Sequence, residues 1–189
     1  VEVTGNVADG AHVEPGAVLL SVEGPTHALL QAERPALNLV GHLSGIATAT
    51  RAWVDAVAGT PARIRDTRKT TPGLRALEKY AVRCGGGVNH RMSLSDAALV
   101  KDNHVLAAGG VAAAFAAVRA RFPEVELEVE VDSLEQLDEV LAAGADLVLL
   151  DNFDTDRMRI AVARTAGRAR LEASGGLTFD AARAVAQTG

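Results

Sequence analysis

The sequence predicts an incomplete α/β barrel. Its 189 residues are 48% apolar and 23% charged, which is the balance of a soluble globular protein and not of a disordered chain. From about residue 62 onward, short apolar runs of strand type alternate with longer segments of helical periodicity, as in a parallel sheet covered by helices. Polar residues follow each apparent strand, and the active sites of α/β barrels lie at the carboxyl ends of their strands.

The first third of the chain has a different pattern. Residues 1 to about 33 predict short strands and turns, because four glycines interrupt apolar segments such as 17–23. From about residue 35 to 58, apolar side chains recur at helical spacing and predict a helix. Gly41 and Gly45 lower the helix propensity of that segment and indicate close packing or a break.

Five strand–helix units follow. We expect strands at 62–67, 97–100, 126–131, 147–150 and 170–173, and helices at 74–82, 111–121, 134–142, 156–165 and 179–186. An open doubly wound sheet would have the same rhythm, and solvated loops would also be polar, but a polar group at every strand end favours the barrel. These groups are Thr67-Arg68-Lys69, Lys101-Asp102-Asn103, Glu130, Asp151 and Ser174-Gly175-Gly176. Since a closed barrel typically takes about 250 residues, we expect a further strand after Gly189. We also expect a chain cut at both ends, because it begins at Val1 rather than Met and stops just after a helical pattern.

The segment 126–132 carries the most detailed expectation. Acidic residues occupy its even positions and apolar residues its odd positions, so the two kinds lie on opposite faces of a strand. The apolar face must pack against helices, so the acids point into the barrel, where buried carboxylates need cationic partners. We expect Arg63 and Arg65 to supply these partners, with Glu130 near the open mouth. A solvent-facing edge strand would instead leave the acids hydrated.

Several function classes are disfavoured by composition. The net charge of −5 argues against a nucleic-acid partner held by bulk charge. A single cysteine, Cys84, rules out an internal disulfide framework, has no partner pattern for zinc or a thiol mechanism, and fits the cytoplasm. The histidines have no metal-ligand spacing, and no apolar run is long enough to cross a bilayer.

Each polar motif by itself is only a weak indication of function. The turn 67–73 could be merely solvated, and the glycine-rich loop 85–92 lacks the ending of a Walker loop. Lys101 could be a Schiff-base nucleophile, an anion binder or a surface charge, and 174–176 could hold a phosphate or make a tight turn. Together they place cations around two acids, an arrangement that suits a polyanionic ligand. The cations are Arg34, Arg68, Lys69, Arg91 and Lys101, and the acids are Glu130 and Asp151.

An ordered series of segments resembles the quinolinate phosphoribosyltransferase family. The most distinctive is residues 66–75, DTRKTTPGLR. The others are 24–38, 43–48, 89–96, 101–104, 128–131, 150–152 and 172–176, so the similarity covers essentially the whole chain. The resemblance implies a remainder of an amino-terminal α/β sandwich domain at 1–35, followed at 36–189 by an incomplete TIM-like α/β barrel, truncated at its carboxyl end. It also implies a homodimer or an assembly of dimers.

The resemblance further implies an activity in NAD biosynthesis. Members of the family transfer phosphoribosyl from phosphoribosyl pyrophosphate to quinolinate with decarboxylation, giving nicotinate mononucleotide, pyrophosphate and carbon dioxide, with Mg²⁺ as cofactor. By likeness, the two carboxylates of quinolinate are held by Arg34, Arg68, His90, Arg91 and Lys101, and Arg34 reaches the neighbouring subunit's site.

The resemblance also assigns the donor side of the site. The implied catalytic residues are Lys69, which approaches the phosphoribosyl donor, and Glu130 and Asp151, which meet its ribose hydroxyls and magnesium. Thr67 and the turn Ser174-Gly175-Gly176 line the same site, the turn near phosphate.

The sequence also leaves alternative functions open. A lipoyl-type carrier module fits residues 10–19, but such modules need a lysine, and none precedes Lys69. An aldolase that uses Lys101 as a Schiff-base nucleophile is a rival enzyme. A relative linked to molybdenum transport shares the expected fold, and the chain could be an inactive fragment of the enzyme.

Overall fold

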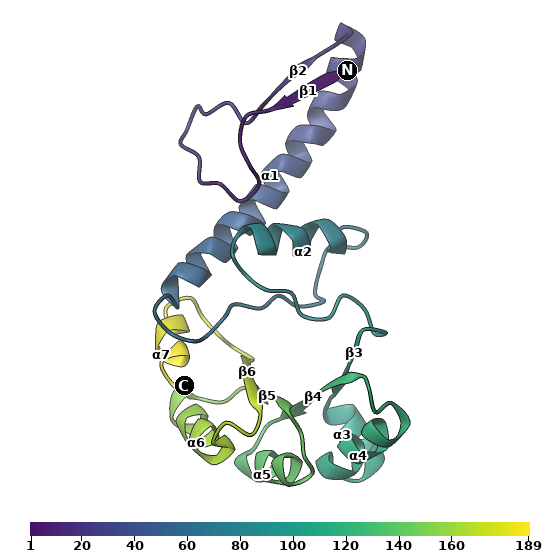
Figure 1. Ribbon diagram of the computed structural model, residues 1–189, viewed down its shortest axis with the longest axis vertical. Helices are drawn as coiled ribbons and strands as arrows, with labels where there is room; N and C mark the ends of the chain where they lie inside the picture. The colour runs from purple at the N-terminus through teal and green to yellow at the C-terminus, as the bar shows by residue number, and fades with distance from the viewer. The chain divides into compact units, whose positions relative to one another are not determined.

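The computed structural model describes residues 1–189, and these residues form two compact units. The first unit comprises Val1–Asp55 and Arg63–His90, and the second comprises Ala56–Ala62 and Arg91–Gly189. Figure 1 shows the elements of each unit. The predicted domain boundary near residue 35 stays a prediction.

The first unit contains an antiparallel strand pair and two helices. Strand β1 (Glu2–Gly5) pairs with β2 (Leu20–Glu23), and the helices are α1 (Thr26–Ala56) and α2 (Arg75–Cys84). Helix α1 begins before the predicted start near residue 35, and Pro35 lies inside it. The residues between Thr26 and Pro35 are mostly strong helix formers, so the helix extends toward its amino end through a proline that usually marks a boundary.

The predicted strand at 62–67 is wrong as an extended element. Only one parallel bridge forms there, between Arg65 and Val88. The Val88 N–H donates to Ile64 O at 2.8 Å, and the Asp66 N–H donates to Val88 O at 3.1 Å. The partner segment follows the glycine run 85–87, which is turn-like and leaves too few extended residues for a longer ladder.

The second unit is built on a parallel sheet, as expected. Its strands lie in sequence order, β3 (Ala97–Val100), β4 (Glu126–Val131), β5 (Leu147–Asp151) and β6 (Arg170–Ser174). The helices are α3 (Asp102–Ala108), α4 (Val111–Arg121), α5 (Leu134–Ala142), α6 (Thr155–Thr165) and α7 (Ala182–Ala186). Figure 1 shows α4, α5 and α6 along one side of the sheet. Consecutive parallel strands joined by helices form the wall of an α/β barrel.

Helix α3 lies between the predicted strand at 97–100 and the predicted helix at 111–121, where no element was predicted. It starts directly after β3, and the His104 ring Nδ1 accepts a hydrogen bond from the Lys101 backbone N–H at 3.0 Å. This bond satisfies a backbone donor at the start of the helix. Gly109, in the left-handed conformation with φ of 80°, ends the helix.

The core of the second unit lies between the sheet and its helices. Leu127, Val129 and Val131 of β4 are each at most 1% exposed and pack with Leu137 and Val140 of α5. The predicted direction of the apolar face of β4 is therefore confirmed. Each such fully buried side chain contributes roughly 1.5–3 kcal/mol to the free energy of folding.

The acidic face of β4 is only partly buried. Glu128 is 2% exposed, Glu130 is half-buried and Glu126 is exposed. Arg170 on β6 pairs with Glu126 at 2.9 Å, and Lys101 pairs with Glu130 at 3.2 Å. Cations of the second unit thus contribute to ion pairing along this face, and the pairing with Arg63 and Arg65 stays a prediction.

No single helix has the length and apolar composition to cross a bilayer, and only the sharply bent pair α3 and α4 meets the criterion jointly.

Candidate active site

Polar side chains gather at the carboxyl edge of the parallel sheet. Lys101 follows β3, Glu130 lies near the end of β4, and Asp151 and Ser174 end β5 and β6. Asp151 and Ser174 are register partners, so their backbones lie directly opposite one another. Because the strands are parallel and adjacent, these residues share one edge of the second unit.

A cavity of about 330 Å³ opens at this edge. Its lining consists of Asp102, Val105, Leu106, Glu130, Val131, Asp132, Gln136 and Asp151. The Lys101 ammonium lies 3.2 Å from the Glu130 carboxylate, with the Lys101 side chain 49% exposed and that of Glu130 19% exposed. The cavity wall is therefore rich in carboxylate oxygen, and one cation stands beside it. Hydroxyl groups, a hard metal ion or developing positive charge suit such a wall.

The turn after β6 packs against the residue after β5. Asn152 has φ of 55°, donates its backbone N–H to Ser174 O at 2.9 Å, and donates its side-chain N–H to Asp151 at 2.7 Å. A Cβ built on Gly175 would lie 2.2 Å from the Asn152 Oδ1. Gly175 also has φ of 83°, so only glycine fits this position. Asn152 thereby fixes both the Asp151 carboxylate and the turn 174–176.

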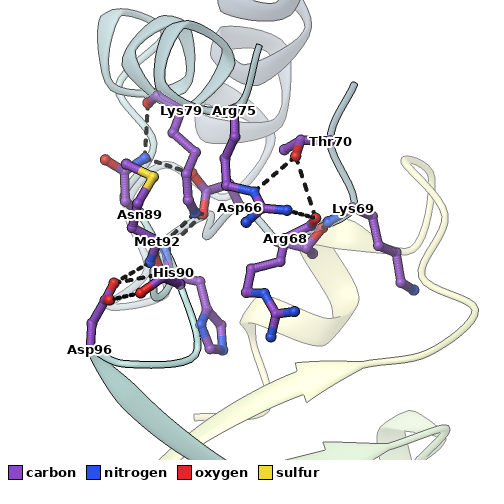
Figure 2. A network of polar contacts seen from close by, with 12 residues as sticks. Asp66, Arg68, Lys69, Thr70, Arg75, Lys79, Asn89, His90, Met92 and Asp96 are labelled. Atoms are coloured by element: carbon purple, nitrogen blue, oxygen red, sulfur yellow. Dashed lines mark hydrogen bonds and ion pairs between the residues drawn. The ribbon is translucent and has the colours of Figure 1, made fainter. Parts of the chain in front are cut away.

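A second polar cluster lies within the first unit and is centred on Asp66. The buried Lys79 ammonium pairs with Asp66 Oδ1, and the His90 backbone N–H donates to the same oxygen at 2.7 Å. Asn89 donates its side-chain N–H to Asp66 Oδ2 at 2.6 Å (Figure 2). The side chains of Lys79 and Asp66 are 1% and 8% exposed. This carboxylate therefore ties the chain before Arg68 to the chain at His90.

Helix α2 also holds the turn 67–71. The Arg75 guanidinium donates to Arg68 O at 3.2 Å and to Thr70 Oγ1 at 3.0 Å. The Thr71 N–H donates to Glu78 at 3.1 Å, and the His42 ring is hydrogen-bonded to Glu78 at 2.8 Å. The bond from Thr71, followed by that from His42, lowers the pKa of Glu78, so this carboxyl is held in its charged form.

Comparison with known proteins decides the family. The sequence model of the family "quinolinate phosphoribosyl transferase, C-terminal domain" matches residues 46–189, and the corresponding N-terminal domain model matches residues 1–44. The chain belongs to the quinolinate phosphoribosyltransferase family. The fold class and the phosphoribosyltransferase family that the sequence resemblance implied are thereby confirmed.

Individual relatives agree with this assignment. The chain is 60% identical over 186 residues to a nicotinate-nucleotide pyrophosphorylase (carboxylating) of Mycobacterium leprae, covering 97% of this chain and 66% of the relative. It is 43% identical to the human enzyme of that name, covering 95% and 62%. The solved nicotinate-nucleotide pyrophosphorylase of Francisella tularensis has a TM-score of 0.96 at 41% identity, covering 100% and 67%. The chain thus spans less than two thirds of the length of the Mycobacterium leprae and human relatives.

The residues singled out from the phosphoribosyltransferase motifs fall into two sets. Those in the first unit are Arg34, Thr67, Arg68, Lys69 and His90. Those in the second unit are Arg91, Lys101, Glu130, Asp151, Ser174, Gly175 and Gly176. The second unit brings Lys101, Glu130 and Asp151 to one sheet edge, while Arg91 donates to Ala97 O at 2.9 Å at the start of β3. In the first unit, Arg34 is exposed on α1, and Thr67 and Lys69 are exposed on the turn that α2 holds.

Sequence reasoning missed several residues around these phosphoribosyltransferase motifs. Asp132 and Gln136 line the cavity, although only the even-position acid pattern of β4 gave any signal for Asp132. Asn152 was part of a family motif, but its positive φ could not be foreseen from one sequence. Nothing in the sequence singled out Lys79, which lies in a predicted helix and whose side chain is buried against Asp66.

Proposed function

We propose that the protein containing this chain transfers phosphoribosyl from phosphoribosyl pyrophosphate to quinolinate, releasing pyrophosphate and carbon dioxide and forming nicotinate mononucleotide. The observation that carries the proposal is the alignment of Lys101, Glu130, Asp151 and Ser174 at the carboxyl ends of four adjacent parallel strands. Active sites of α/β barrels form at that edge. The 60% identity to a carboxylating pyrophosphorylase supports the same reaction.

Quinolinate is a small dianion, and five cationic or hydrogen-bonding side chains hold its carboxylates. They are Arg34, Arg68, His90, Arg91 and Lys101. Planar guanidinium groups bind a carboxylate through two parallel hydrogen bonds, which also fixes its orientation. One ion pair at about 4 Å with an effective dielectric near 20 is worth roughly 4 kcal/mol, so two or three orient the ring. This orientation presents the ring nitrogen to the anomeric carbon of the donor.

The donor binds across Lys69, the turn 174–176 and the acidic cavity wall. Thr67 lines the same site. The backbone amides of the glycine turn suit a phosphate. As the bond from the anomeric carbon to pyrophosphate breaks and the bond to the ring nitrogen forms, positive charge builds on the ribose. Glu130 and Asp151 stabilise that charge and accept hydrogen bonds from the ribose hydroxyls.

Decarboxylation follows from the charge on the product ring. Once the nitrogen is bonded to ribose it is a cationic pyridinium, and the bond between the ring and the adjacent carboxylate breaks to release carbon dioxide. The electron pair stays on the ring carbon next to the positive nitrogen and then takes up a proton.

Glu130 and Asp151 fit a magnesium ion by their chemistry. Mg²⁺ takes oxygen ligands, commonly one or two carboxylates plus substrate phosphates, and both side chains line the carboxylate-rich cavity. When bound, the ion neutralises the leaving pyrophosphate. The contacts of Glu130 and Asp151 to the ion can be direct or through water.

A homodimer, or an assembly of dimers, completes the site by supplying Arg34 from the neighbouring subunit. Arg34 is exposed on α1, a helix in which Thr50 is the one buried residue. Mixed dimers of Arg34→Ala and Lys101→Ala subunits test this sharing, because one of the two sites then has both wild-type residues. Recovered activity is expected. Verified mixed dimers without activity would contradict the shared Arg34.

We further infer a cytoplasmic location, with no nucleic-acid or membrane partner. The net charge of −5 and the single cysteine support this assignment. Fractionation of cells expressing the full-length protein measures it, and recovery in the membrane fraction would contradict it.

Product detection tests the reaction. The full-length protein is incubated with quinolinate, phosphoribosyl pyrophosphate and Mg²⁺, and nicotinate mononucleotide is measured by chromatography. Arg68→Ala and Lys101→Ala should weaken quinolinate binding in calorimetry with little loss of stability. Arg121→Ala, which removes an exposed charge at the end of α4, is the matched control. Unchanged quinolinate binding in the first two variants would refute the proposed pocket.

A further inference from the structure

The buried lysine of helix α2 has no part in the reaction described above. Lys79 is the largest side chain among those almost fully buried, and that side chain is 1% exposed. A buried charge is costly unless it is paired and hydrogen-bonded, so its surroundings must compensate. It pairs with Asp66 and also donates to His90 O at 3.0 Å. Both contacts lie within the first unit.

The Asp66 carboxylate connects two segments that are far apart in sequence. It accepts from the Lys79 ammonium, from the His90 backbone N–H at 2.7 Å and from the Asn89 side chain at 2.6 Å. Asn89 also donates to Lys79 O at 2.9 Å. The backbone of His90 is therefore bonded to both members of the ion pair: its N–H donates to Asp66, and its C=O accepts from Lys79. Such closed networks define one geometry more tightly than separate hydrogen bonds.

Each segment carries a side chain that the proposed function uses. Arg68 lies two residues after Asp66, and His90 is itself part of the network. Figure 2 shows the Arg68 guanidinium and the His90 ring extending to the same side of the view, away from the Lys79 ammonium. The turn that carries Arg68 has additional support, since Arg75 donates to Arg68 O. The backbone N–H of His90 donates to Asp66, and its C=O accepts from Lys79.

We propose that Lys79 and Asp66 are positioning residues that set the separation between Arg68 and His90, and thereby select a ligand with two adjacent carboxylates. The inference rests on the proposed function, because that function assigns Arg68 and His90 to quinolinate. The ion pair does not touch the substrate. It acts by holding the peptide groups of His90 in register with the turn 67–71.

Binding calorimetry on the full-length protein tests the selection. Lys79→Met keeps the length of the side chain and removes its charge. We expect the affinity for quinolinate to fall about a hundredfold, because a small misplacement of a positioned group can cost a factor of that size. The affinity for nicotinate, which has one carboxylate, should stay nearly unchanged. Arg83→Met on the exposed side of the same helix is the matched control and should alter neither affinity.

Two results would overturn the positioning role. One is an unchanged ratio of quinolinate to nicotinate affinity in Lys79→Met. The other is an equal loss of both affinities with a smaller folded fraction, which is what a purely stabilising residue would give. If Lys79→Met does not fold, Asn89→Ala removes two bonds of the network and leaves the ion pair in place. It should lower the ratio by a smaller factor, and an unchanged ratio would again overturn the proposal.

Amide hydrogen exchange separates this inference from the proposed function. In the wild type, the His90 amide should exchange slowly because it donates to a buried carboxylate, and Lys79→Met should accelerate its exchange. If the wild type does not bind quinolinate, the proposed function falls, and so does the selection of a dicarboxylate. Accelerated exchange would then still support the positioning of His90, and equal exchange would refute it.

Discussion

Replacing Glu130 by Gln should separate the stability of the protein from its activity. Glu130 pairs with Lys101 at 3.2 Å at the cavity edge. At that distance, and with an effective dielectric near 20, the gross attraction is about 5 kcal/mol. Nearly half of the Lys101 side chain is exposed, however, so water and salt screen the pair, and its net contribution should be up to about 1 kcal/mol. Gln keeps the shape of the side chain and one carbonyl acceptor for Lys101.

The same substitution should cost far more in catalysis. If Glu130 stabilises positive charge on the ribose, its neutralisation should lower kcat/KM by about 10²–10³. Urea denaturation measures the free energy of unfolding, and nucleotide formation by the full-length protein measures kcat/KM. Glu126→Gln is the control, because Glu126 lies on the same face of β4 and pairs with Arg170 at 2.9 Å on the sheet. It should lose a similar small stability and no activity.

Two outcomes would refute this reasoning. A loss of about 3–5 kcal/mol in Glu130→Gln would show that the pair behaves as a buried one. A kcat/KM that stays within about tenfold of the wild type would show that the Glu130 charge does not act in the transition state.

Three further predictions concern the framework around the site. The hydrogen bond to Asp9 is the largest influence on the pKa of Tyr80 and raises it to about 12. Asp9→Asn should move this pKa toward 10.0, which the tyrosinate absorbance of the single tyrosine measures. An unmoved titration midpoint would contradict the contact. Leu137→Ala, at a fully buried position of α5, should lower the unfolding free energy by about 2–5 kcal/mol in urea, and a loss below about 1 kcal/mol would contradict tight packing there. The hydrogen bond from Thr71 lowers the pKa of Glu78 below 4.5, so the charged carboxylate stabilises the fold above pH 4.5 and this stabilisation is lost as the pH falls below that value. Glu78→Gln should therefore reduce the fall in unfolding free energy at acid pH. An unchanged acid dependence would refute the contribution.

The periodic parts of the fold could be predicted from the sequence. The strand at 126–131 and the helices at 111–121 and 134–142 have the predicted bounds. Alternation in β4 also gave the direction of its apolar face, because burial against helices leaves only one choice. The polar residues after the predicted strands also indicated the sheet edge at which Lys101, Glu130 and Asp151 lie.

The remaining features depend on tertiary contacts that no local pattern records. The segment 62–67 has strand-like residues, yet its one β-bridge joins Arg65 to Val88, which lies outside any strand. Lys79 lies in a predicted helix, and its burial depends on Asp66 and His90, which come from other segments. Helix α3 follows its strand without a loop, since the His104 ring accepts from the Lys101 N–H. The roles assigned to the site residues stay predictions.

Release of labelled carbon dioxide is the most direct measure of the proposed reaction. Quinolinate labelled in the carboxylate beside the ring nitrogen is given to the full-length protein with and without phosphoribosyl pyrophosphate. We expect one labelled carbon dioxide for each nicotinate mononucleotide formed, and none when the donor is omitted. A folded wild-type protein that releases no label with both substrates present, or that releases it without the donor, would contradict the proposed function.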